Sequence, residues 1–177
     1  MRRFVLAVLI GAPIVALDAQ APAAPDTAAR RAAMQKLAFL AGDWVGPATA
    51  NMPGGPLRMQ QTEWVRYKLG GQILVVEGVG RLLAGETPGD TVFNAFAIVD
   101  WTPQHGYRMR STTLEGRSGE FPLEVSDSGF VWATSAQGGR VRYTMRLTPA
   151  GEWHEVGEYL REGAPAIKVI EMRLKRR

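Results

Sequence analysis

The feature that most constrains the fold is an alternation of apolar and polar residues that begins near residue 44. It is clearest in RVRYTMRL, residues 140–147, where Val141, Tyr143, Met145 and Leu147 fall on one side and the arginines and the threonine on the other. Successive side chains of a β-strand point to opposite faces of its sheet. The pattern therefore predicts a strand with one dry face and one wet face.

About ten such segments follow one another, separated by turns of hairpin length that are rich in Gly, Pro and Asp. The expected strands cover residues 44–51, 57–69, 72–82, 91–101, 107–114, 120–125, 130–135, 140–147, 153–160 and 166–175. No helical segment long enough for a parallel crossover lies between them. The sequence predicts an all-β fold, a single antiparallel up-and-down barrel of about ten strands, because closure removes the exposed edges of a long meander. A two-sheet sandwich is the alternative.

The residues before the first strand divide into three parts. Residues 1–19 are expected to be a signal peptide, with Arg2 and Arg3 ahead of an apolar run and cleavage after Ala19. Residues 20–33 form an Ala/Pro-rich segment that we expect to be flexible. A short helical turn over residues 34–40 then opens the barrel domain, residues 34–177.

The leader predicts an exported protein, periplasmic or secreted. Its apolar run of about 14 residues contains Pro13 and is too short for a stable membrane span. The 177 residues include no cysteine, which excludes disulfides, thiolate metal sites and a lipid-attachment cysteine. The formal net charge of +4 is spread along strands as outward arginines, so no nucleic-acid partner is expected. Nothing in the sequence indicates the oligomeric state.

The stretch LAFLAGDWVG, residues 37–46, resembles the Gly-x-Trp signature of lipocalins and their calycin relatives. It is more similar to bacterial lipocalin-like families of unknown function, with further likeness in residues 69–78, 148–160 and 170–177. The resemblance implies a calycin-like barrel in which Trp44 closes one end and packs against an arginine near the end of the last strand. Arg173 is the best-placed arginine and Arg176 the second. Gly42 would let the first strand bend where the barrel closes.

Two glutamates share faces with apolar residues. Glu63 lies with Gln61 on the face of Leu57 and Val65, and Glu155 lies on the face of Trp153. A carboxylate inside a barrel needs a partner or a bound cation. An internal hydrogen-bond network with tyrosines would supply the partner, unless the faces are wrongly assigned.

Alternatively, these polar groups orient a ligand in an aromatic pocket. The candidate lining residues are Glu63, Tyr67, Tyr107, Met109, Trp132, Tyr143, Met145 and Glu155. The expected function is binding of a small apolar or amphipathic molecule, with no catalytic residue assigned and no cofactor. An enzyme that uses Glu63 or Glu155 as an acid or base is a less favoured alternative.

The Phe-Leu-x-Gly-x-Trp-x-Gly opening is also similar to that of nitrobindin-like haem barrels. That resemblance implies an iron ligand from a histidine on a strand near the C-terminus, and His154 lies in this part of the chain. Neither face of its strand is cleanly apolar, so the sequence leaves the direction of His154 open. Haem is therefore the alternative ligand.

Overall fold

The computed structural model describes residues 26–177 and contains the ten expected strands. The signal peptide predicted for residues 1–19 lies outside the described residues. The strands are β1 (Gly42–Met52), β2 (Gly55–Lys68), β3 (Ile73–Ala84), β4 (Thr87–Thr102), β5 (Gly106–Thr113), β6 (Ser118–Ser126), β7 (Gly129–Ala136), β8 (Gly139–Leu147), β9 (Trp153–Leu160) and β10 (Ile167–Arg176).

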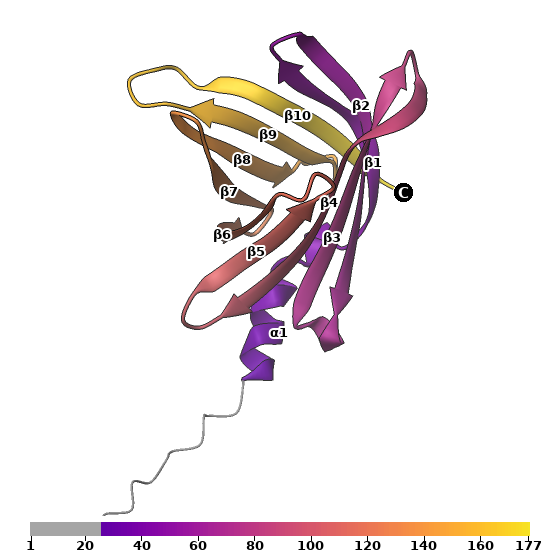
Figure 1. Ribbon diagram of the computed structural model, residues 1–177. Helices are drawn as coiled ribbons and strands as arrows, with labels where there is room; N and C mark the ends of the chain where they lie inside the picture. The colour runs from indigo at the N-terminus through magenta and orange to yellow at the C-terminus, as the bar shows by residue number, and fades with distance from the viewer. Residues whose placement is uncertain (1–25) are drawn as a thin grey trace, which may run out of the picture.

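Each strand pairs antiparallel with the next, and β1 also pairs with β10, which closes the sheet into one barrel (Figure 1). At the closing seam Trp44 lies opposite Arg176 and Ala48 opposite Met172. The predicted all-β, up-and-down barrel is therefore confirmed, and the sandwich alternative is wrong. The alternating pattern predicted the strands correctly, because one face of each strand lines a closed interior and must be apolar.

The helical region before the barrel is longer than predicted. The helix α1 spans Thr27–Gln35, and a single-turn helix, η1, spans Ala38–Leu40. Asp26 caps α1 by accepting a hydrogen bond from the backbone N–H of Ala29 at 2.9 Å. The prediction of a flexible segment over residues 20–33 is therefore wrong for residues 27–33. The Ala- and Arg-rich run after Pro25 has high helix propensity, and Asp26 supplies its start.

The helix α1 covers one end of the barrel (Figure 1). Two tyrosines reach it from the barrel interior. The Tyr67 hydroxyl donates to the Met34 carbonyl at 2.7 Å, and the Tyr107 hydroxyl donates to the Ala33 carbonyl at 2.7 Å. Together with the burial of Met34, these bonds fix the helix across this end, which we call the closed end. No helix among residues 26–177 is long and apolar enough to cross a membrane.

Trp44 fills the closed end, as predicted. Its side chain is completely buried, and its indole N–H donates to the Leu40 carbonyl at 2.7 Å. The arginine that packs on it is Arg176, whose guanidinium carbon lies 4.3 Å from the ring centroid. The assignment of Arg173 was wrong, because Arg173 points to the outer face, where it lies 3.8 Å from Glu171. Arg176 is the residue directly opposite Trp44 in the register.

Two glycines permit the close approach of strands at the seam. Gly42 has a φ of 141°, in the region that favours glycine, and begins β1. A Cβ at Gly46 would lie 2.0 Å from the Arg173 carbonyl oxygen of β10. Gly42 therefore begins β1 with a backbone angle that other residues rarely adopt, and a side chain at position 46 would collide with β10.

Candidate functional site

The inward face of the barrel has two halves with different burial. Toward the closed end it is packed, with a core that includes Trp44, Val65, Leu74, Phe130, Met145, Trp153 and Leu174. In the half away from α1, inward-facing side chains are only half-buried, among them Phe93, Ala95, Phe121, Trp132 and Tyr143. We call this half of the interior the lumen.

Three buried polar side chains lie on this inward face of the barrel. Gln61, Glu63 and Glu155 are 4%, 7% and 8% exposed, so both glutamates point inward as their strand patterns predicted. The Gln61 amide donates to Glu63 Oε1 at 2.7 Å, and the Trp153 indole donates to Glu155 Oε2 at 3.0 Å. The predicted network with tyrosines is not found among the described residues: each glutamate accepts from one donor, an amide and an indole, whereas Tyr67 bonds to α1.

Burial raises the pKa of both glutamates toward neutral pH. Desolvation raises the pKa of Glu63 from 4.5 to about 8, against the lowering effect of the Gln61 hydrogen bond. The charge of Glu155 raises the same pKa further, so the two carboxylates lie close enough to repel. Desolvation also raises the pKa of Glu155 from 4.5 to about 7, while the indoles of Trp153 and Trp132 lower it. The pair therefore changes its charge across the physiological pH range.

Acceptor atoms in this cluster outnumber its donors. Among residues 26–177, no hydrogen bond reaches Glu63 Oε2 or Gln61 Oε1. The Gln61 oxygen lies close to the β3 backbone, because a Cβ at Gly80 would be 2.9 Å from it.

Glycines provide the room that these side chains occupy. A Cβ at Gly78 would lie 2.7 Å from Glu63 Oε1, so the carboxylate lies flat against the bare backbone of β3. A Cβ at Gly157 would lie 2.9 Å from the Tyr143 ring. The Glu63 carboxylate and the Tyr143 ring therefore both lie against the barrel wall, and any larger residue at either glycine would push them into the lumen.

Aromatic rings form the wall beside the carboxylates. Trp132 and Tyr143 stack with their centroids 4.2 Å apart and an interplanar angle of 8°, and Phe121 lies 5.0 Å from Trp132. On the helix side, Trp153 packs edge-on against Trp44 at 5.8 Å. Glu155 therefore lies beside the indoles of Trp153 and Trp132 on the inward face.

The structure brings together part of the predicted lining. Glu63, Met109, Trp132, Tyr143 and Glu155 all face the interior. Three other candidates have structural positions: Met145 is 1% exposed within the packed core, and Tyr67 and Tyr107 hold α1 at the closed end. Gln61 and Phe121 belong to the site and were absent from the candidate lining. Gln61 was detectable from its position two residues before Glu63 on the same face.

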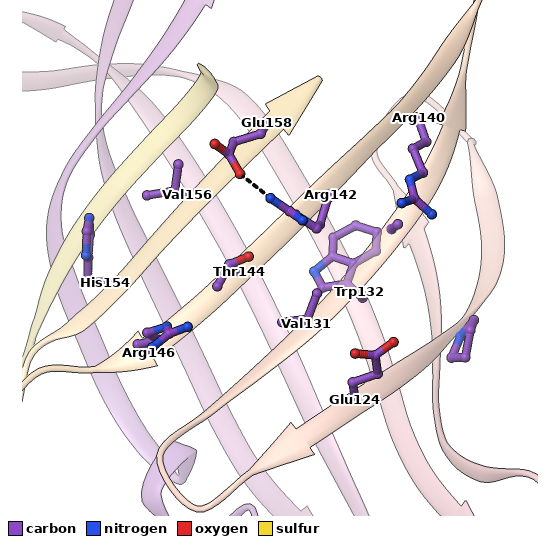
Figure 2. A pocket seen from close by; sticks show the side chains of 12 residues that line it. Glu124, Val131, Trp132, Arg140, Arg142, Thr144, Arg146, His154, Val156 and Glu158 are labelled. Carbon is purple, nitrogen blue, oxygen red and sulfur yellow. Dashed lines mark hydrogen bonds and ion pairs between the residues drawn. The ribbon is translucent and has the colours of Figure 1, made fainter. Parts of the chain in front are cut away.

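His154 points out of the barrel. Its Nε2 lies 2.9 Å from Glu171 Oε1 on the outer face of β10, and Figure 2 shows it beside the outer side chains of β8 and β9. His105, the other histidine of the chain, lies exposed in the turn between β4 and β5. Neither imidazole reaches the interior, so the residues present do not fit a histidine-ligated haem inside this barrel. Within residues 26–177, no three His, Asp or Glu side chains cluster as metal ligands.

A groove of about 800 Å³ crosses the outer face of β6 to β9 (Figure 2). It is open to solvent, and its polar lining includes His154 and the charged side chains of Glu124, Arg140, Arg142, Arg146 and Glu158. Arg142 and Glu158 pair with each other at 2.8 Å, and the His154 partner Glu171 has its pKa lowered to about 2 by hydrogen bonds from Lys168 and His154. This surface matches the solvated, outward arginine face expected from the sequence.

Comparison with known proteins finds likeness at the level of the fold. The crystal structure of Rv2717c from M. tuberculosis is similar to this chain, with a TM-score of 0.61 and 14% sequence identity. The match covers 82% of this chain and 97% of that one. At this identity the likeness shows a shared barrel fold alone. No family model and no curated protein matches the chain.

Proposed function

We propose that the protein is a calycin-like barrel that holds a small apolar or amphipathic molecule in its lumen. The observation that carries this proposal is the unequal burial of the interior. The half beside α1 is packed like a core, whereas the aromatic side chains of Phe121, Trp132 and Tyr143 in the other half are only half-buried. A barrel that needed only stability would gain by burying them fully, since burying one aromatic side chain contributes roughly 2 kcal/mol or more.

Two further features support a binding role. The aromatic wall of Trp132 and Tyr143 offers a rigid surface for an apolar group, and the cluster of Gln61, Glu63 and Glu155 offers a few fixed polar atoms. Apolar walls with a small number of placed polar groups are typical of small-molecule sites. The closed end supports the calycin-like assignment, because Trp44 closes it and packs against Arg176, as the resemblance to lipocalins implies.

The test compares a large residue placed inside the barrel with the same residue placed outside. Ala95 faces the lumen next to Gly78, whereas Ala133 lines the outer groove. An environment-sensitive apolar dye should bind the protein, lose binding in Ala95→Phe and keep it in Ala133→Phe. Thermal unfolding of both variants checks that they fold. Loss of binding in Ala133→Phe alone, or no dye uptake by the folded protein, would contradict the proposal.

Export belongs to the same proposal and rests on the leader sequence. Expression of the full chain in a bacterial host should give a periplasmic product whose mass lacks residues 1–19. A cytoplasmic product of full mass would contradict it.

General acid–base catalysis by the two glutamates is a second candidate function. The observation that favours it is the pair of pKa values near 8 and 7, which lets each group hold or release a proton at neutral pH. A panel of chromogenic ester and glycoside substrates tests it. Turnover in the protein that disappears in Glu63→Gln and Glu155→Gln would support catalysis. Equal rates in the three proteins would contradict it.

A further inference from the structure

We propose that the end of the barrel opposite α1 docks onto the surface of an anionic lipid bilayer. Five β-hairpins turn at this end, and we call their ends, residues 51–58, 81–92, 114–117, 137–141 and 161–168, the rim. In the docked barrel, apolar side chains of the rim enter the lipid and arginines of the rim lie at its headgroups. The proposal goes beyond the proposed binding function and does not depend on it.

The first argument is where the exposed apolar residues lie. Seven large apolar residues of the range 26–177 are exposed, and five of them belong to the rim. These five are between 37% and 67% exposed: Met52, Leu82, Val92, Leu114 and Ile167. Of the other two, Leu69 lies in a turn at the closed end and Phe96 on the outer face of β4. Single exposed apolar residues are ordinary on a protein surface, but their concentration at one end indicates a contact surface.

The second argument is the arrangement of these five residues around the rim. They come from four different hairpins, β1–β2, β3–β4, β5–β6 and β9–β10, and three of these hairpins are seen extending away from α1 in Figure 1. A folded protein partner would need a matching ring of pockets to cover them. A lipid surface accepts each hairpin tip separately, because the hydrophobic gain depends on the apolar area removed from water and not on direction.

The third argument is the charge beside the apolar residues. The rim carries six basic and four acidic residues, a net charge of +2. The basic residues are Arg58, Arg81, Arg117, Arg140, Arg161 and Lys168, and the acidic ones are Glu86, Asp90, Glu115 and Glu162. Basic residues next to a membrane-inserted apolar group are attracted to anionic headgroups. A second copy of the barrel is a poorer partner, since two rims of the same net charge would repel each other.

The basic residues of the rim are also less paired than those of the outer wall. Four arginines of the rim make no ion pair with another residue of the range 26–177: Arg58, Arg81, Arg140 and Arg161. On the outer wall, Arg108, Arg110 and Arg142 each pair with a carboxylate on a neighbouring strand. The rim therefore combines unpaired positive charge with exposed apolar side chains, and an anionic bilayer satisfies both.

The experiment makes use of the absence of cysteine from the chain. One cysteine is introduced in each of three full-length variants, Leu114→Cys, Ile167→Cys and Leu69→Cys, and is labelled with NBD, a fluorophore whose emission shifts to the blue in lipid. Leu69 is the matched control, because it is 68% exposed at the closed end and Leu114 is 67% exposed on the rim. Vesicles of phosphatidylcholine, with and without phosphatidylglycerol, are then added. Circular dichroism checks that each labelled variant is folded.

The expected result is that the labels at positions 114 and 167 shift to the blue on vesicles that contain phosphatidylglycerol and are quenched by nitroxide-labelled lipid. The label at position 69 should stay in water. Vesicle binding should weaken about fivefold in each of Arg140→Gln and Arg161→Gln, because each removes one basic residue from the lipid surface. Binding should not change in Lys68→Gln, since Lys68 is exposed at the closed end.

Three results would overturn the proposal. In the first, neither rim label senses the lipid. In the second, the label at position 69 enters the lipid as deeply as the rim labels; binding through residues 1–25 would have this effect, because the chain enters the barrel through α1 at the closed end. In the third, the rim labels respond equally to vesicles without phosphatidylglycerol, which would exclude recognition of an anionic surface. Dye binding in the lumen is measured separately, so the proposed binding function can stand or fall independently of these results.

Discussion

The replacement of Glu63 by Gln should stabilise the protein by an amount that grows with pH. The pKa of Glu63 is about 8 in the folded protein and near 4.5 in an unfolded chain. Between these values only the unfolded state has lost the proton. The favourable contribution of protonated Glu63 is therefore fully present below about pH 4.5 and is lost as the pH rises through about 8.

The size of the effect follows from the two pKa values. Each pH unit between them costs the folded state about 1.4 kcal/mol, so the difference between Glu63→Gln and the unmodified protein should grow by about 3 kcal/mol from pH 5 to pH 8. Gln does not titrate and keeps the acceptor for the Gln61 amide. The effect of Glu155→Gln should follow the same direction and level off nearer pH 7, because the pKa of Glu155 is about 7.

Urea unfolding of both proteins at pH 5, 6, 7 and 8 measures this difference directly. The difference between the two proteins is the useful quantity, because the exposed carboxylates contribute equally to each. A flat difference for Glu63→Gln would refute the reasoning, since it would mean that Glu63 is as freely ionised in the folded barrel as in the unfolded chain.

Other substitutions test how the barrel is closed. Arg176→Ala should lower the free energy of unfolding by about 1 to 3 kcal/mol, because it removes the contact with Trp44 and two hydrogen bonds to the backbone before β1, whereas Arg173→Ala should change it by less than about 0.5 kcal/mol. Tyr67→Phe and Tyr107→Phe should each cost about 1 kcal/mol and speed hydrogen exchange in α1, and unchanged exchange would contradict the anchoring role. Gly46→Ala should destabilise by several kcal/mol because the new Cβ would meet the Arg173 carbonyl, while Gly54→Ala, with open space around it, should be tolerated; thermal unfolding distinguishes the two.

Most of the fold was predictable because the alternation of apolar and polar residues reports directly on a closed interior. Every expected strand is present, and Trp44 closes one end as expected from its Gly-x-Trp context. The partner of Trp44 was harder to predict, since Arg173 and Arg176 both lie near the end of β10. The register decides between them by placing Arg176 directly opposite Trp44. Sequence spacing alone carries no register between the first and last strands.

The candidate site was predicted less completely, because residue type does not specify depth along a barrel. Tyr67, Tyr107 and Tyr143 all face inward, yet two of them lie at the closed end and bind α1. Only the third lies beside Glu155 and the lumen. The direction of His154 also depended on which face of β9 turned inward, and the strand pattern left this open. Burial of the neighbouring Trp153 and Glu155 settles it.

Whether the lumen binds a ligand can be measured most directly from the indole N–H signals of the tryptophans during titration with the apolar dye. Trp153 donates to Glu155 inside the barrel, whereas Trp64 lies on the outer face of β2. A saturable shift of the Trp153 signal, together with that of Trp132 and with Trp64 unmoved, is the predicted result. Saturable binding that leaves the Trp153 signal in place would contradict a site in the lumen.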